Sequence, residues 1–150
     1  ATAVVMVGEH RGIGLHNLLW ILRTFPNHFK NFIFVSVGIV DVESFSAKKE
    51  LTTMQENTNE MLDYFVNYCQ QQGLAAKGFA AYGTDPTEKL TRLSKKIIKE
   101  FPHSLFFASK LIFSKDNWIT RLLHNETAVM LQRRLHLLGV QLVILPMKID

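Results

Sequence analysis

The stretch that decides the fold is VVMVGEHRGIGLHNLLWILRTF, which runs from Val4 to Phe25. It begins with a short apolar run, Val4–Val7, continues through three glycines, and ends in an apolar segment that starts at Leu15. A strand, a glycine-containing turn and a helix in this order are typical of the first unit of an α/β domain. Such a turn can also hold a phosphate at the helix N-terminus.

Short apolar runs alternate with longer amphipathic segments along the whole chain. The runs that indicate strands are Val4–Val7, Phe32–Val37, Phe79–Tyr82, Leu105–Ala108 and Leu142–Leu145. Most of them are apolar without a break, as expected for parallel strands that are covered on both faces. The alternation predicts one three-layer, doubly wound α/β domain over residues 1–150, with a five-stranded parallel sheet.

The segments between the strands predict four helices. Their expected ranges are Leu15–Phe25, about Ala47–Gln72, Asp85–Phe101, and Asn125–Gly139. The first is apolar almost all round, so it is predicted to be buried and to end at Pro26. In the third, Asp85 can cap the helix, Pro86 fits its first position and Glu88 can reach back to the cap.

Composition limits the classes of protein. The chain has 150 residues, of which 47% are hydrophobic, enough for the core of one domain. No apolar run approaches the ~20 residues that span a bilayer, and the first residues lack the basic stretch and apolar core expected of a secretory signal. The lone Cys69 excludes an internal disulfide and fits a reducing cytosol. A net charge of +4 permits an anionic partner, but nucleic acid is not expected.

The first candidate site is the turn after Val4–Val7. A dinucleotide fingerprint through Gly12 and Gly14 would need a third glycine at Asn17, and the phosphate-loop pattern is also absent. Two interpretations stay open. The glycines shape a turn that lets the helix pack closely, or the turn offers backbone N–H groups to an anion. The candidate anion or nucleotide ligands are Gly8, Glu9, His10, Arg11, Gly12 and Gly14.

A second group of candidates follows the fourth predicted strand. In an open α/β sheet, ligands collect outside the carboxyl ends of the strands, where the strand order reverses. We expect this group to face the Gly8–Gly14 turn there. Capping of the last helix is an alternative role for Asn125. The residues of this group are Ser109, Lys110, Asn117, Arg121, His124 and Asn125.

The sequence contains no recognisable catalytic or metal-binding motif. Six histidines are present, but there is no H-E-x-x-H and no paired cysteine motif. A G-x-S-x-G nucleophile elbow is also missing, and Cys69 lies in a predicted helix as a core residue. We therefore expect a protein that is not an enzyme and that uses no metal or cofactor.

One charge pattern is regular. Lys89, Arg92, Lys96 and Lys99 recur at helical spacing, opposite the apolar face of the third predicted helix. A solvated outer face explains this basic stripe most simply. The alternative is contact with an anionic lipid surface or an acidic partner segment.

The order of the segments resembles the universal stress protein fold over essentially the whole chain. The matching pieces are VVMVGEH, FIFVSVG, FAAYGTDP, SLFFASK and LHLLGVQLVILP. ATP-binding members of that family carry G-x-x-G and a later G-[ST] after the fourth strand. Here the region reads ASKLIFSKDNWITRLLHNETA and contains no glycine, so ATP is not expected to be held in the family manner.

A second resemblance to a known family involves longer sequence segments. NHFKNFIFVSVG, GTDPTEKLTRL, FPHSLFFASKLIF, DNWITRLLHNETA, LQRRLHLLG and VILPMKI look like the cytosolic C-terminal domain of bacterial amino acid permeases of the amino acid–polyamine–organocation superfamily. This resemblance implies a regulatory or oligomerisation domain on the cytoplasmic side of the inner membrane. It also implies a transmembrane permease domain upstream in the same chain.

Two further expectations concern partners and the competing function. The apolar last strand, Gln141–Leu145, would leave an edge through which a homodimer can form. The alternative function is a stand-alone stress-type protein. It would bind a nucleotide or signalling dinucleotide through the Gly8–Gly14 turn and the Ser109–Asn125 region.

Overall fold

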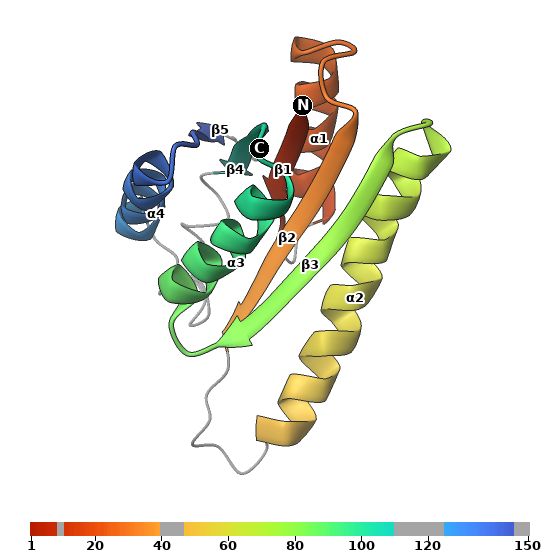
Figure 1. Ribbon diagram of the computed structural model, residues 1–150. Helices are drawn as coiled ribbons and strands as arrows, with labels where there is room; N and C mark the ends of the chain where they lie inside the picture. The colour runs from red at the N-terminus through yellow and green to blue at the C-terminus, as the bar shows by residue number, and fades with distance from the viewer. Residues whose placement is uncertain (9–10, 40–46, 110–124, 146–150) are drawn as a thin grey trace.

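The computed structural model describes residues 1–8, 11–39, 47–109 and 125–145. Within them, five strands form one sheet in the order β3-β2-β1-β4-β5, and every neighbouring pair is parallel. The predicted doubly wound α/β fold is thus confirmed (Figure 1). The strands are β1 (Thr2–Met6), β2 (Asn31–Ile39), β3 (Ala75–Gly83), β4 (Ser104–Ser109) and β5 (Leu142–Leu145).

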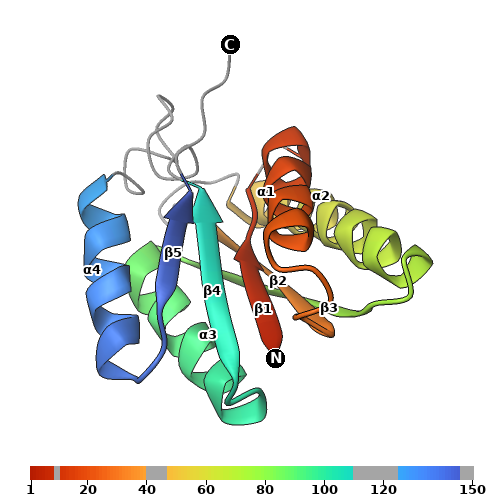
Figure 2. The ribbon, with the colours of Figure 1, turned by 90° about the horizontal axis from the view of Figure 1, so that it is seen from above.

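Two pairs of helices cover the sheet, one pair on each face (Figure 2). Leu18 of α1 and Phe65 of α2 belong to one core cluster, together with Phe34 of the sheet. The second cluster contains residues of α3 and α4, among them Ile97 and Leu135. The helices are α1 (Arg11–Thr24), α2 (Ala47–Gln71), α3 (Pro86–Glu100) and α4 (Asn125–Leu137).

Strand β1 lies at the centre of the sheet, and all five of its residues are buried. This explains why every residue of it after Thr2 is apolar, because both of its faces pack against helix layers. The edge strand β3 has no buried residue and is rich in alanine and glycine. Burial within the sheet therefore follows the predicted three-layer arrangement.

Helix boundaries were predicted well where capping chemistry was present. Asp85 accepts a hydrogen bond from the backbone N–H of Glu88 at 3.2 Å, as expected of an N-cap. The Glu88 carboxylate pairs with Arg92 at 2.9 Å, and no bond back to the cap is found among the described contacts. Gly73 and Gly139 follow α2 and α4 with φ of 78° and 87°, the left-handed conformation that ends a helix.

The expected start and burial of the first helix were wrong. Helix α1 begins at Arg11, so Gly12 and Gly14 lie in its first turns and are not part of a loop. Its outer face is open to solvent, since Leu19 is 38% exposed and His16 is exposed. None of the helices in the described ranges is long and apolar enough to cross a membrane.

Candidate functional site

The predicted site region is the carboxyl edge of the sheet between β1 and β4. The strand order reverses there, and in open α/β sheets this is the place where ligands usually bind. Gly8 follows β1, helix α1 begins close by at Arg11, and Ser109 ends β4. The structure thus brings together the described ends of the two predicted segments. Ser109 is buried and already has an interaction partner.

Half of the predicted ligands cannot be placed. Asn125 begins α4 with its backbone, but its side chain is not described, so its role as a cap stays untested. The residues that lie outside the described ranges are Glu9, His10, Lys110, Asn117, Arg121 and His124.

Gly14 is a packing glycine. A Cβ atom at this position would lie 2.5 Å from Cζ of Phe65 in α2, far inside van der Waals contact. The Phe65 ring is fully buried and stacks on Phe34, with 5.2 Å between ring centroids. Gly14 therefore lets α1 approach α2 closely, which supports the packing interpretation of this stretch.

The neighbours of Gly14 differ in their surroundings. Gly12 is exposed, and a Cβ added to it would meet nothing within 4 Å. The Arg11 guanidinium lies 5.2 Å from the centroid of the Tyr64 ring in α2, which fits a cation–π contact. Arg11 and Gly14 thus both contact α2, whereas a side chain at Gly12 would contact nothing.

Sequence reasoning missed the most unusual residue of this region, Asn17 of α1. It is completely buried, and neither its side-chain nitrogen nor its oxygen has a hydrogen-bond partner. It shares the inward face of the helix with Gly14 and Leu18. An amide left in this state costs roughly 1–3 kcal/mol. The signal was present in the sequence, because Asn17 stands where the dinucleotide fingerprint has a glycine.

The thiol of Cys69 is buried and is expected to be unreactive. Burial raises its pKa to about 12, so it stays protonated at neutral pH and is a poor nucleophile. Folding raises the pKa of this thiol, so the unfolded chain ionises first as the pH rises. The thiol therefore lowers the stability of the fold only above its ordinary pKa of 9.0. Its predicted role as a core residue is confirmed. Within the described ranges, no group of histidine, cysteine and acidic residues is arranged to hold a metal ion.

The four cations of the predicted basic stripe do lie along α3, but their surroundings differ. Arg92 is paired with Glu88, and the Lys96 ammonium lies 5.8 Å from the centroid of the Phe79 ring. The aliphatic carbons of the Lys89 side chain pack over Gly83, where an added Cβ would lie 2.5 Å from Cε of Lys89. Lys99 is exposed and forms no ion pair with a described residue. The stripe is therefore not a uniform row of free charges.

The free edge of β5 is partly occupied. The Gln141 carbonyl accepts from Phe106 of β4, so the next carbonyl, that of Leu142, points away from the sheet. The side chain of Gln132 in α4 donates to that Leu142 carbonyl at 2.8 Å. A second copy that pairs with this edge would have to displace Gln132, and the predicted homodimer stays untested.

Comparison with known proteins supports the fold. No protein-family model and no curated protein sequence matches the chain. The chain is similar to the crystal structure of a protein from the universal stress protein family of Burkholderia pseudomallei, with a TM-score of 0.64. The match covers 97% of this chain and 96% of that one at 15% sequence identity. The expected universal-stress-protein-like fold is confirmed by this similarity.

Proposed function

We propose that the chain is a non-enzymatic, cytosolic regulatory or oligomerisation domain of an amino acid transporter. The structural observation that supports this proposal is the close approach of Gly14 to Phe65, which favours packing over phosphate binding for the opening stretch. It gives one glycine of the opening stretch a packing role in the core. The transporter part rests on the resemblance of long sequence segments, such as DNWITRLLHNETA, to the permease domain.

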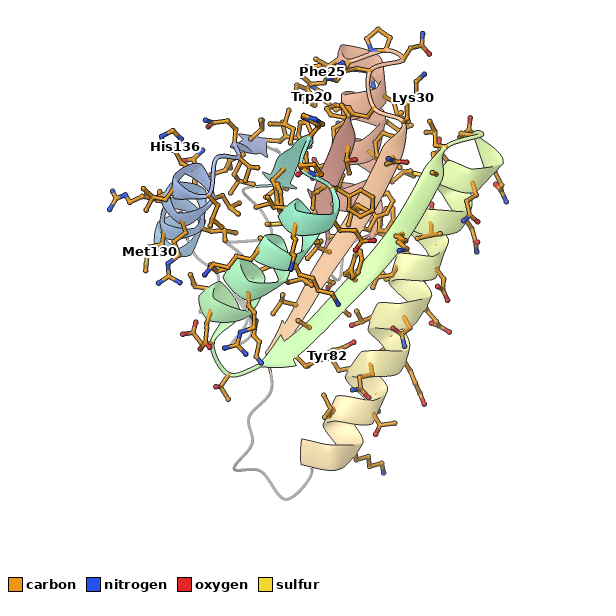
Figure 3. The ribbon with its side chains drawn as sticks, viewed as in Figure 1. Trp20, Phe25, Lys30, Tyr82, Met130 and His136 are labelled. Atoms are coloured by element: carbon orange, nitrogen blue, oxygen red, sulfur yellow. The ribbon has the colours of Figure 1, made fainter. Side chains whose placement is uncertain are left out.

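The exposed side of α4 supports a role in assembly. Val129, Met130 and Leu137 are 50%, 47% and 81% exposed, which is high for large apolar side chains on one short helix. Figure 3 shows Met130 and His136 on the outer side of α4, away from the sheet. A subunit or a permease loop that covers these side chains would bury apolar surface without displacing Gln132.

The test is transport by the intact protein. Solute uptake would be measured in proteoliposomes for the natural full-length chain and for a form that ends before Ala1. We expect the shortened form to insert in the membrane but to differ in initial uptake rate, in its regulation, or in oligomeric state. A full-length Gly12→Ala variant, which we expect to keep the domain folded because its Cβ would meet nothing within 4 Å, serves as control. Identical uptake, regulation and assembly in the shortened form would refute the proposal.

A second candidate function is favoured by Asn17 alone. An unpartnered, buried amide in the middle of α1 is a group that a hydrogen-bonding ligand such as a nucleotide or signalling dinucleotide can satisfy. Calorimetry with Mg·ATP and with a cyclic dinucleotide tests it. Saturable binding in which Asn17 is required would favour this candidate over the transporter role.

A further inference from the structure

Both the chain start and the ends of all four helices lie at one end of the molecule. Each helix runs back against the parallel strands, as Figure 2 shows for α4 beside β5. The last turns of the helices therefore lie beside the first residues of the strands. Ala1 is held at this end, because its carbonyl accepts from the N–H of Lys30 and Thr2 donates to the carbonyl of His103.

We call this region the amino end and define it as residues 1–2, 21–31, 67–77, 94–104 and 131–142. It carries eight lysines and arginines but a single acidic residue, Glu100, so its side chains sum to +7. Because the whole chain carries +4, the remaining side chains sum to −3. All eight cations are exposed: Arg23, Lys30, Lys77, Lys95, Lys96, Lys99, Arg133 and Arg134.

Few of these cations are neutralised by neighbours. Glu100 pairs with Lys77 at 3.4 Å, and the other seven form no ion pair with a described carboxylate. Favourable interaction with helix C-termini explains Arg23, Lys99 and Arg134, which lie in last helical turns. It does not explain the other five, which come from strands, a loop and earlier helical turns. The charge of the amino end therefore exceeds what helix capping requires.

The shape of this charge distribution favours a lipid surface over a peptide. The cations come from four separate segments at one end of the domain and not from the walls of one groove. Leu137, the most exposed large apolar residue in the described ranges, lies at the same end. Half-buried Phe25 lies in the same region, and the half-buried Trp20 packs against it with 6.1 Å between the ring centroids (Figure 3). Apolar and aromatic side chains beside cations are typical of proteins that lie on headgroups.

We propose that the amino end docks on anionic headgroups of the leaflet beneath which the domain is tethered, an inference that rests on the proposed function. A tether that enters at Ala1 would hold this end toward the bilayer. The contact differs from the α3 stripe. It includes Lys96 and Lys99, excludes Lys89 and Arg92, and adds cations from the other segments.

The test is co-sedimentation of the 150-residue chain with vesicles of phosphatidylglycerol and phosphatidylcholine, with pure phosphatidylcholine vesicles for comparison. One variant carries Lys30→Gln, Lys99→Gln and Arg134→Gln. The control, Lys49→Gln, Lys89→Gln and Arg92→Gln, removes the same charge outside the amino end. We expect the parent and the control to bind only the anionic vesicles. The amino-end variant should bind them about a hundredfold more weakly.

Three results would overturn the inference: no binding of the parent to anionic vesicles, equal losses in both variants, or equal binding by the amino-end variant and the parent. Tighter binding of the parent to an acidic polypeptide such as polyglutamate than to the vesicles would assign the surface to a protein instead, and would also overturn it. Vesicle binding involves no transporter, so its failure is distinguishable from failure of the uptake experiment.

Discussion

Replacing Gly14 by alanine is expected to lower the free energy of unfolding by about 1–3 kcal/mol. The new Cβ would lie 2.5 Å from Cζ of Phe65. The ring has little freedom to move, because it is fully buried and stacks on Phe34. In an exposed helix the same change would stabilise by up to about 1 kcal/mol, so the packing cost must exceed that gain.

Gly12→Ala is the matched control for this prediction. It lies in the same helix, two residues earlier, and its Cβ would meet nothing within 4 Å. We expect it to leave the free energy of unfolding in urea unchanged, or to raise it by up to about 1 kcal/mol. Equal stability of the two alanine variants would show that the close approach of α1 to α2 is not required. The double variant Gly14→Ala/Phe65→Leu should lose less stability than the sum of the losses in the two single variants.

Replacing Asn17 by leucine is expected to stabilise the unliganded protein by about 1–3 kcal/mol. Both polar atoms of the amide are buried without a partner, so an apolar side chain of similar branching removes their desolvation cost. Asn17→Asp should do the opposite at neutral pH, because it places a carboxylate in the same dry environment. Burial would raise the pKa of that new carboxyl, so the loss should shrink as the pH is lowered.

Urea titrations of the three proteins check this prediction, each with and without Mg·ATP. A less stable leucine variant would mean that the amide has a partner in solution, and the prediction would be wrong. Stabilisation of the parent by Mg·ATP, absent in the leucine variant, would identify that partner as a nucleotide. It would also favour the second candidate function.

The fold was predictable because its signals are local. Apolar runs, most of them unbroken, marked all five strands, and the Asp85-Pro86 pair marked the start of α3 within one residue. The start of α1 was missed for a physical reason. Glycine has low helix propensity, so Gly12 and Gly14 indicated a loop. Gly14 nevertheless lies in α1, and the lack of a side chain there leaves room for the ring of Phe65.

The candidate site was less predictable, because its properties depend on contacts between distant segments. Periodicity placed Lys96 on a stripe of α3, but its contact with Phe79 of β3 needs the folded structure. Asn17 was recognised only as a missing glycine, and its burial without a partner comes from the packing of α1. The basic amino end gathers cations from four segments and becomes visible only once the topology is known.

The most direct test of the transporter account is the location of the natural gene product that contains residues 1–150. Membranes would be washed with alkaline carbonate, and the domain followed with an antibody to it. The account predicts that the domain stays with the washed membranes, and that protease digests it in inside-out vesicles but not in right-side-out vesicles. Recovery of the domain in the soluble fraction, free of any membrane segment, would contradict the account.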